Sequence, residues 1–328
     1  MSGRTEIPVI DVSGWLAGDS AAQNTPAEID SICRDHGFFV ITGHGIEAQL
    51  ISDVRAACIS FFSLPEEVKA AYQPPPGEYV GYLRQEALSY SRGDASPPDL
   101  KETYTCNRMD VPADDPYFHT PESRPFFSPN VWPGEVAGFS AAWIQYYRAA
   151  DALAVRMMGL MAVALGLPQD QFDPYVDKSI SSMRALYYPA LGKEPLPGQF
   201  RAGAHSDFGS FTMLMTDAAP GGLEVLHRNG SWMKVPHVPG ALVVNIGDLM
   251  AQWTNDRWVS TMHRVVTPPV GPGTSRLSIV YFHQPNYDAL IETLPTCCDA
   301  GNPSRYDPVT SGQHLMRKVQ LQREMASS

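Results

Sequence analysis

Apolar and polar residues follow different spacings in successive parts of this chain. In the first 75 or so residues, short apolar runs such as Phe38–Thr42 alternate with amphipathic stretches. One of these stretches begins at Thr25-Pro26-Ala27-Glu28, a sequence typical of a helix start. The pattern predicts strands at residues 8–12 and 38–42, and helices over 25–36, up to Phe61-Phe62, and from Pro65 onward.

The middle of the chain changes character twice. Residues 74–132 are rich in proline, glycine and aromatic side chains, which predicts an irregular segment that covers neighbouring structure. From Val136 to Ala164, apolar residues then recur at steps of three and four, up to the helix-ending sequence at Gly166. We interpret this stretch as a scaffold helix facing the core, in preference to a partner-binding surface.

Residues 180–285 have the pattern of a β structure. Short runs of branched and aromatic residues are separated by glycines, and Asn229-Gly230 stands between two such runs as a hairpin signal. Closely spaced strands without intervening helices predict a sandwich, jelly roll or barrel. A surface helix is expected over 313–324. The predicted fold is α+β with a mainly β core, divided into an N-terminal α/β region with covering loops (1–132) and a scaffold helix with the catalytic core (133–328), forming one integrated unit.

Composition narrows the class of protein. The chain has 328 residues, is 44% hydrophobic and carries a formal net charge of −11, which argues against general affinity for nucleic acid or anionic membranes. No apolar run approaches the length of a membrane span, and the first residues do not resemble a signal peptide. The five cysteines are odd in number and include no CxxC pair. These features predict a soluble cytoplasmic protein with reduced thiols.

Candidate metal ligands lie in the β-rich part. His205 and Asp207 are two residues apart, so on a strand both side chains would project from one face. His263, from a later strand, could supply a third ligand. Two imidazoles and one carboxylate on one face of an ion form the facial triad of non-haem iron(II) oxygenases, which leaves positions open for a co-substrate and O₂.

Two further strands carry arginines on a common face. In RLSIVYFH, alternation places Arg276 and Ser278 on the same side, and a guanidinium fork with a nearby hydroxyl suits a carboxylate. In MRALYYP, Arg184, Leu186 and Tyr188 share a face in the same way. These faces predict a cavity with a metal at one end and a carboxylate anchor beyond it.

Together these residues resemble the signature of iron(II)- and 2-oxoglutarate-dependent dioxygenases, in the branch that includes isopenicillin N synthase. The resemblance covers nearly the whole chain, through IPVIDVSGW, HGFFVITGHGI, FFSLPEEVKAAY, GGLEVL, VVNIGDLMAQWTND and STMHRVV. Within the branch, DLKETY and RAGAHSDFGSFTML look most similar to fungal thymine 7-hydroxylase-like and microbial ethylene-forming-type enzymes.

The resemblance implies a double-stranded β-helix (jelly roll) that uses Fe(II), 2-oxoglutarate and O₂ to hydroxylate, desaturate or cyclise a small organic molecule. It implies that His205, Asp207 and His263 bind iron, and that Arg276, Ser278 and Tyr188 bind the distal carboxylate of 2-oxoglutarate. Many relatives have Asn where Leu186 stands. The candidate substrate contacts are Arg184, Phe208 and Phe282, with Tyr104 and the 79–90 region as residues that close over the pocket.

Other functions fit the same residues less completely. A 2-oxoglutarate-independent oxidative cyclase resembling isopenicillin N synthase would use Arg276 and Ser278 for a substrate carboxylate. A non-catalytic jelly-roll binding protein would need no metal, and a zinc hydrolase would leave the RxS strand without a role. The candidate substrates are a nucleobase-like heterocycle, an amino acid and an intermediate of secondary metabolism.

Overall fold

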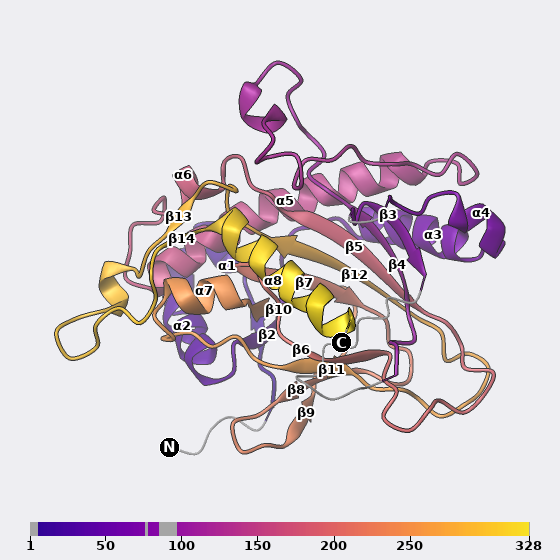
Figure 1. Ribbon diagram of the computed structural model, residues 1–328. Coiled ribbons are helices and arrows are strands. Elements are labelled where there is room, and N and C mark those ends of the chain that lie inside the picture. The colour runs from indigo at the N-terminus through magenta and orange to yellow at the C-terminus, as the bar shows by residue number, and fades with distance from the viewer. Residues whose placement is uncertain (1–5, 76–77, 85–96, 328) are drawn as a thin grey trace.

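Two β-sheets form the centre of the molecule (Figure 1). The computed structural model describes residues 6–75, 78–84 and 97–327. The large sheet contains, in spatial order, β1 (Val9–Asp11), β2 (Phe38–Thr42), β10 (Leu242–Ile246), β7 (Phe211–Thr216), β12 (Arg276–His283), β5 (Ser182–Tyr188), β4 (Glu102–Cys106) and β3 (Gly81–Arg84). The small sheet contains β6 (Ala202–His205), β11 (His263–Val265), β8 (Leu223–Leu226) and β9 (Trp232–Lys234). A ribbon of β13 (Leu290–Ile291) and β14 (Val309–Thr310) lies apart from both sheets. These sheets form the jelly-roll core that the sequence predicts.

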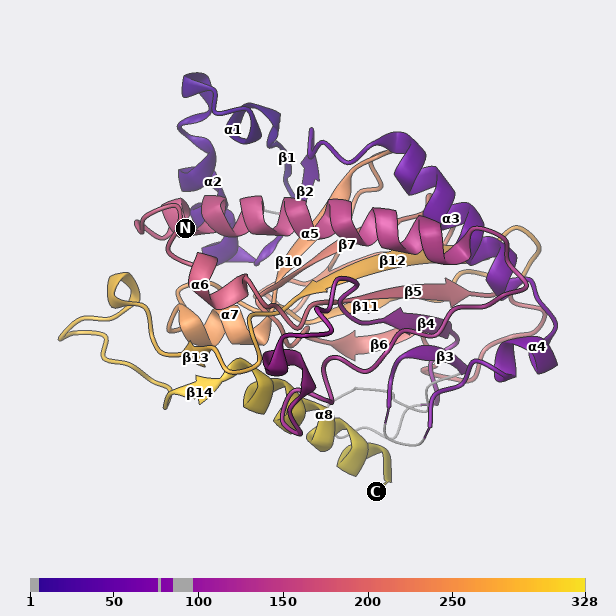
Figure 2. The same cartoon turned by 90° about the horizontal axis from the view of Figure 1, so that it is seen from above.

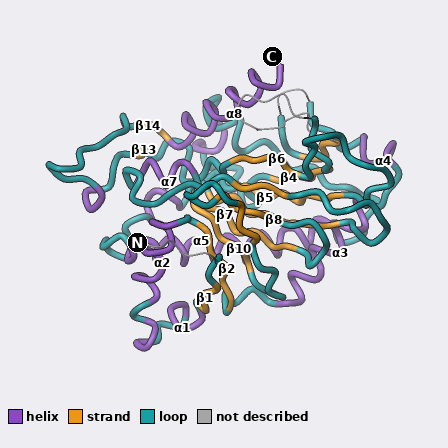
Figure 3. The backbone as a smooth tube through the Cα atoms, turned by 90° about the horizontal axis from the view of Figure 1, so that it is seen from below, coloured by secondary structure: helices purple, strands orange, loops and turns teal. Residues whose placement is uncertain are grey.

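The helices lie on opposite sides of the strands. The longer ones are α2 (Thr25–Asp35), α3 (Ala48–Phe62), α5 (Phe139–Ala164) and α8 (Ser311–Ser327). The shorter ones are α1 (Ser13–Leu16), α4 (Glu66–Ala70), α6 (Asp173–Val176) and α7 (Asp248–Trp253), with 3₁₀ turns at Ser20–Ala22, Pro116–His119 and Pro295–Cys297. Figures 2 and 3 show α5 and α3 along one side of the strands and α8 on the opposite side. Within the described residues, every helix is too short or too polar to cross a bilayer.

The large sheet separates a packed core from a cavity. On β12, Leu277, Ile279 and Tyr281 belong to the main hydrophobic cluster, together with the buried residues of α3 and α5. The alternate residues of the same strand, beginning with Arg276 and Ser278, line a cavity on the other face. Side chains alternate along a strand, so one strand can serve both environments. The predicted scaffold role of the 136–164 helix is confirmed.

The segment from 74 to 132 is less irregular than predicted. It contains β3 and β4, which extend the large sheet beyond β5 through the pairs Tyr104–Ala185 and Tyr82–Tyr104. The sequence prediction was wrong here because each run has only four or five residues, and its strand state depends on pairing with the edge of β5 rather than on its own composition. The large sheet takes strands from both sides of residue 132, and the division at that residue stays a prediction.

Several local predictions are confirmed with small shifts. The hairpin is formed by β8 and β9 with Leu226 opposite Trp232, and Gly230 in its turn has a φ of +86°. The helix predicted over 25–36 spans Thr25–Asp35, but its N-cap is Asn24, which makes no side-chain capping bond. The C-terminal helix begins at Ser311, two residues before the predicted start.

A matched pair of truncations in α5 tests the assignment of its core face. Leu153 is buried, whereas Val155 is 43% exposed. We expect Leu153→Ala to lower the free energy of unfolding by about 2–5 kcal/mol, because it leaves a cavity in the main core. Val155→Ala should change it by less than about 0.5 kcal/mol. Urea unfolding followed by circular dichroism measures both, and equal effects would contradict the assigned orientation.

Candidate active site

A cavity of about 530 Å³ lies between the two sheets. Its walls come from the small sheet, from the β4, β5, β7, β10 and β12 strands of the large sheet, and from Leu315, Met316 and Val319 of α8. It contains the residues from which the sequence predicted metal binding and carboxylate binding. The tertiary fold therefore brings both predicted features into one space.

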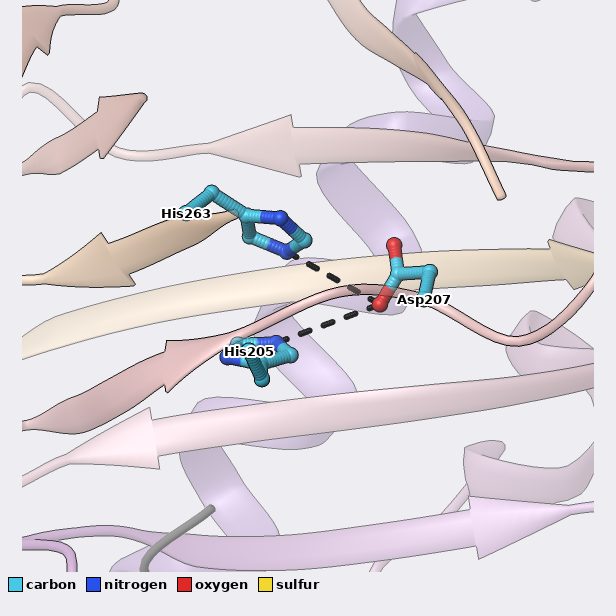
Figure 4. A group of neighbouring side chains, drawn as sticks. All are labelled: His205, Asp207 and His263. Atoms are coloured by element: carbon cyan, nitrogen blue, oxygen red, sulfur yellow. Dashed lines mark ion pairs between the residues drawn. The ribbon is translucent and has the colours of Figure 1, made fainter. Parts of the chain in front are cut away.

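His205, Asp207 and His263 form a cluster at one wall of this cavity. One potential ligand atom from each residue lies within 4.8 Å of the others. Asp207 Oδ1 is 3.9 Å from Nε2 of His205 and 3.8 Å from Nε2 of His263. Figure 4 shows both imidazole rings turned toward this carboxylate oxygen. The two histidines are directly paired across neighbouring strands β6 and β11, which explains their proximity.

Backbone carbonyls determine which ring nitrogens face the cluster. Nδ1 of His205 lies 2.8 Å from the Gly203 carbonyl, and Nδ1 of His263 lies 3.1 Å from the Thr261 carbonyl. A carbonyl oxygen can only accept a hydrogen bond, so each Nδ1 carries a proton, and a neutral ring then has its lone pair on Nε2. This arrangement orients both histidines as metal ligands.

The Asp207 carboxylate is held through one oxygen. Oδ2 accepts hydrogen bonds from Thr212 Oγ1 at 3.0 Å and from Asn245 Nδ2 at 2.7 Å. Both donors belong to the large sheet, on β7 and β10. Oδ1 is the oxygen that faces the two histidines, so the carboxylate can offer it to an ion without losing these bonds.

The protonation states of the cluster suit a cation. Burial, and then the neighbouring His263, lower the pKa of His205 well below its usual value, so the ring is neutral at physiological pH. Burial alone would raise the pKa of Asp207. The two histidines and the hydrogen bonds from Asn245 and Thr212 outweigh that effect and lower it. A neutral imidazole and an ionised carboxylate are the forms that bind metal.

Asp207 lies beyond the end of the strand that carries His205. β6 ends at His205, so the prediction that both ligands share a strand was wrong. A close backbone approach fixes the segment instead: the Asp248 N–H donates to the Asp207 carbonyl at 2.7 Å. A Cβ on Gly247 would stand 2.3 Å from the Gly209 carbonyl oxygen, so only glycine permits this packing.

The large sheet presents the predicted carboxylate-binding residues in a regular array. Arg276 pairs with Tyr188, Ser278 with Leu186, and Val280 with Arg184 across β12 and β5. All of these side chains line the cavity, as the alternation of the two strands predicted. Arg276 and Arg184 therefore stand four residues apart along the cavity wall.

Arg276 is a buried cation whose hydrogen bonds leave part of its guanidinium without a partner. Nη1 donates to the carbonyls of Asp217, Ala219 and Gly221 at 2.8, 3.4 and 3.5 Å. Nε has no hydrogen-bond partner among the described residues, although Arg276 is only 5% exposed. Burial lowers the pKa of Arg276, and Tyr188 and Asp217 partly offset this. An anionic ligand would compensate such a group.

The predicted substrate contacts lie in the same cavity. Arg184 donates from Nε to Thr105 Oγ1 at 2.9 Å, and its guanidinium lies 5.9 Å from the centre of the Phe282 ring. Phe208 follows Asp207 directly, and Lys318 of α8 lies 5.8 Å from the centre of its ring. Arg184, Phe208 and Phe282 all line the cavity.

Tyr104 lies elsewhere. It is fully buried in the main core against Phe61, Phe139 and Trp143, and its hydroxyl donates to the Val131 carbonyl. The prediction that Tyr104 closes over the pocket and so meets the substrate was wrong, because the alternation of β4 turns Tyr104 toward the helices and Thr105 toward the cavity. Of the 79–90 region, Tyr79 lines the cavity, while Tyr90 lies outside the described residues.

Sequence reasoning missed several residues around the cavity. Asn245 and Thr212, which orient Asp207, lie in ordinary strand sequences. Lys101 lines the cavity and pairs with Asp99 at 2.9 Å, and the other oxygen of Asp99 accepts the Gly203 N–H of β6. The segments DLKETY and VVNIGDL, which carry the family resemblance, contain Asp99, Lys101 and Asn245 and were the available signal for these residues.

Two histidines and one carboxylate on a jelly roll, beside a buried arginine, define the class of non-haem metal-dependent oxygenases. Comparisons with known proteins agree. The family model described as "non-haem dioxygenase in morphine synthesis N-terminal" matches residues 7–135, and that of the "2OG-Fe(II) oxygenase superfamily" matches residues 179–285.

Similar proteins cover almost the whole chain. A 2-oxoglutarate-Fe(II) type oxidoreductase, hxnY of Emericella nidulans, is 36% identical over 93% of this chain and 87% of its own length. The 2-oxoglutarate-dependent dioxygenase thnC of Trichoderma harzianum is 34% identical over 96% and 93%. The crystal structure of the full-length thymine 7-hydroxylase of Neurospora crassa with alpha-KG (2-oxoglutarate) and thymine superposes with a TM-score of 0.84 at 31% identity, covering 98% of each chain.

The chain therefore belongs to the 2OG-Fe(II) oxygenase superfamily. It is a 2-oxoglutarate-dependent dioxygenase that uses Fe(II), 2-oxoglutarate and O₂. These relatives support this function over a 2-oxoglutarate-independent oxidative cyclase and over a non-catalytic binding protein.

The hydrogen bond from Asn245 to Asp207 can be tested by metal binding. Asn245→Leu keeps a similar volume but removes the donor to Asp207 Oδ2, so we expect metal affinity to fall by about 10–100-fold. Titration of the metal-free protein with Mn²⁺, followed calorimetrically, measures this. Asn229→Leu in the exposed β8–β9 turn is the control and should leave the affinity unchanged. Equal affinities for all three proteins would show that Asn245 does not orient the ligand.

Proposed function

We propose that His205, Asp207 and His263 bind the ferrous ion, and that Arg276, Ser278 and Tyr188 bind the distal carboxylate of 2-oxoglutarate. One observation carries this proposal. Three potential metal ligands, and a buried arginine whose Nε has no hydrogen-bond partner among the described residues, lie on the walls of one cavity. When bound, the iron supplies activation of O₂ coupled to oxidative decarboxylation of 2-oxoglutarate.

The residues of the carboxylate anchor have complementary roles. Arg276 provides a positive charge and hydrogen-bond donors. It is buried in the cavity wall, where a charge-assisted hydrogen bond is strong because little water competes for it. Burial raises the pKa of Tyr188, although the nearby Lys101 and Arg276 favour its ionised form. The phenol therefore stays protonated and can donate to a carboxylate. Ser278 is buried beside Arg276 and adds a hydroxyl donor.

The remaining part of the cavity suits a small organic substrate. Arg184 offers donors to acceptor atoms, while Phe208 and Phe282 offer flat apolar surfaces. Leu315, Met316 and Val319 of α8 add an apolar wall that limits the access of water. We propose hydroxylation of a small molecule held between these groups, with desaturation or cyclisation as outcomes that depend on which carbon lies nearest the iron.

We propose a cytoplasmic location and a small-molecule partner, without binding to nucleic acid or membranes. All five cysteines are unpaired, and four of them are buried, which supports a reducing compartment such as the cytoplasm. The cavity volume suits a small molecule, and the net charge of −11 does not favour nucleic acid.

Two substitutions separate metal binding from co-substrate binding. His205→Ala should abolish the formation of succinate from 2-oxoglutarate and weaken Mn²⁺ binding, because it removes a ligand. Arg276→Leu should keep Mn²⁺ binding but raise the KM for 2-oxoglutarate by about 10–100-fold, since a hydrogen-bonded charge pair is lost. Arg228→Leu, on the exposed hairpin, is the control. Succinate formation that survives in His205→Ala, or an unchanged KM in Arg276→Leu, would overturn the assignment.

The proposed substrate contacts can be tested because oxidation of the substrate is coupled to the conversion of 2-oxoglutarate to succinate. Candidate heterocycles and carboxylic acids that stimulate succinate formation identify ligands of the cavity. Arg184→Gln should then lower this stimulation by about tenfold or more, because it removes a charged donor, and leave the slow turnover without substrate unchanged. Arg148→Gln, on the exposed side of α5, is the matched control. If Arg184→Gln responds to every stimulating compound as the unmodified protein does, Arg184 does not contact the substrate.

A further inference from the structure

A second buried arginine lies close behind the carboxylate anchor. Arg201 directly precedes β6 and has no exposed surface. Its guanidinium carbon lies 5.7 Å from the centre of the Tyr188 ring, and Tyr188 in turn is paired with Arg276 across β5 and β12. Arg276 lines the cavity, whereas Arg201 does not. Tyr188 is thus placed near two guanidinium groups.

Both arginines donate to backbone carbonyls of one short segment. Arg201 donates from Nη1 to the Pro220 carbonyl at 2.9 Å, and from Nη2 to the Thr274 carbonyl. Arg276 donates to the carbonyls of residues 217, 219 and 221. The segment 217–221 therefore fixes the two guanidinium groups relative to each other.

Among the described residues, no carboxylate forms an ion pair with either arginine. In the part of the chain that the structure describes, neither one lies within 4.0 Å of an acidic oxygen. The nearby Asp217 carboxylate pairs with Arg55 and accepts the Leu277 N–H. Lys101, the other buried cation at this end, differs because Asp99 lies 2.9 Å away. Within the described part of the chain, Arg201 and Arg276 are therefore the buried cations without an ion-pair partner at this end of the cavity.

Holding two like charges in this environment is unfavourable. Burial, followed by repulsion from Arg276, lowers the pKa of Arg201 to about 10, so it stays charged at neutral pH. Its Nε has no hydrogen-bond partner among the described residues. A purely structural contact to the Pro220 carbonyl would need only a neutral donor. A buried cation without a counter-ion is instead expected where a ligand brings the opposite charge.

We propose that Arg201 is a positioning residue for the co-substrate, acting by its charge through Tyr188 and Arg276. Together the two arginines select a 2-oxo acid that carries a second carboxylate at its far end. This inference rests on the proposed role of Arg276 as the direct carboxylate anchor. Arg201 thereby helps to determine which co-substrate binds, although it does not line the cavity.

Binding of two ligands to the Mn²⁺-loaded protein tests the proposal. 2-Oxoglutarate carries the distal carboxylate, whereas 2-oxobutyrate carries only the 2-oxo acid end. Arg201→Gln removes the charge but keeps a donor, so we expect the Kd for 2-oxoglutarate to rise about tenfold or more. The Kd for 2-oxobutyrate should stay within about twofold, because that ligand has no charge near Arg201. Isothermal titration calorimetry measures both, with Arg228→Gln as the exposed control.

A second variant guards against loss of the fold. Arg201→Lys keeps the charge, and its Kd for 2-oxoglutarate at pH 7 should stay within about threefold of the unmodified protein. A loss of 2-oxoglutarate affinity equal to that of Arg201→Gln, or equal losses for both ligands, would show a structural role and overturn the proposal. An unchanged Kd in Arg201→Gln would overturn it as well.

Arg276→Leu distinguishes this inference from the proposed function. If Arg276→Leu weakens 2-oxoglutarate binding and Arg201→Gln does not, only the role of Arg201 fails. If Arg276→Leu itself leaves 2-oxoglutarate binding unchanged, the anchor is wrong and both proposals fail.

Discussion

The two oxygens of the Asp207 carboxylate serve different parts of the molecule, and the site depends on this division. Oδ2 is bound by side chains of the large sheet, while Oδ1 faces two histidines from the small sheet. A single carboxylate thereby links the two layers of the jelly roll. The link also explains why this acid remains ionised although it is buried: the surrounding donors and histidines outweigh the cost of removing it from water.

The cavity uses the two sheets for different chemistry. The small sheet and the loop after β6 supply the candidate metal ligands, and the large sheet supplies Arg276, Ser278 and Tyr188. A co-substrate held by both must therefore span the gap between the layers. Because the packed core lies on the other face of the large sheet, the positions of these side chains are fixed by the same strands that bury the main hydrophobic cluster.

The buried positive charges of Arg201 and Arg276 link the binding of an anion to the stability of the folded protein. Buried guanidinium groups that donate mainly to carbonyls lose hydration on folding, and an anion that binds only the folded state offsets that loss. Functional sites often keep such locally unfavourable groups because the ligand completes them. The carbonyls of residues 217–221 accept hydrogen bonds from both arginines, and these bonds hold the guanidinium groups in position.

The sequence by itself determined the class of fold, the long helix and the hairpin at Asn229-Gly230, and it singled out the candidate metal ligands and the residues of the proposed carboxylate anchor. These features are local: they follow from periodicity, from turn residues and from a short motif whose spacing matches the chemistry. One example is the confirmed prediction that Arg276 and Ser278 both face the cavity. Successive side chains of a strand point to opposite faces, so residues two apart share a face.

Only the tertiary structure decided the rest. β3 and β4 exist because a partner edge is present, and Tyr104 points to the core because of its register on β4 rather than its type. Asp207 is placed by a glycine contact between distant segments, and Asn245, Thr212 and Arg201 acquire their roles from neighbours far away in the chain. Such contacts depend on which strands pair and in what register, and this is set by the packing of the whole core.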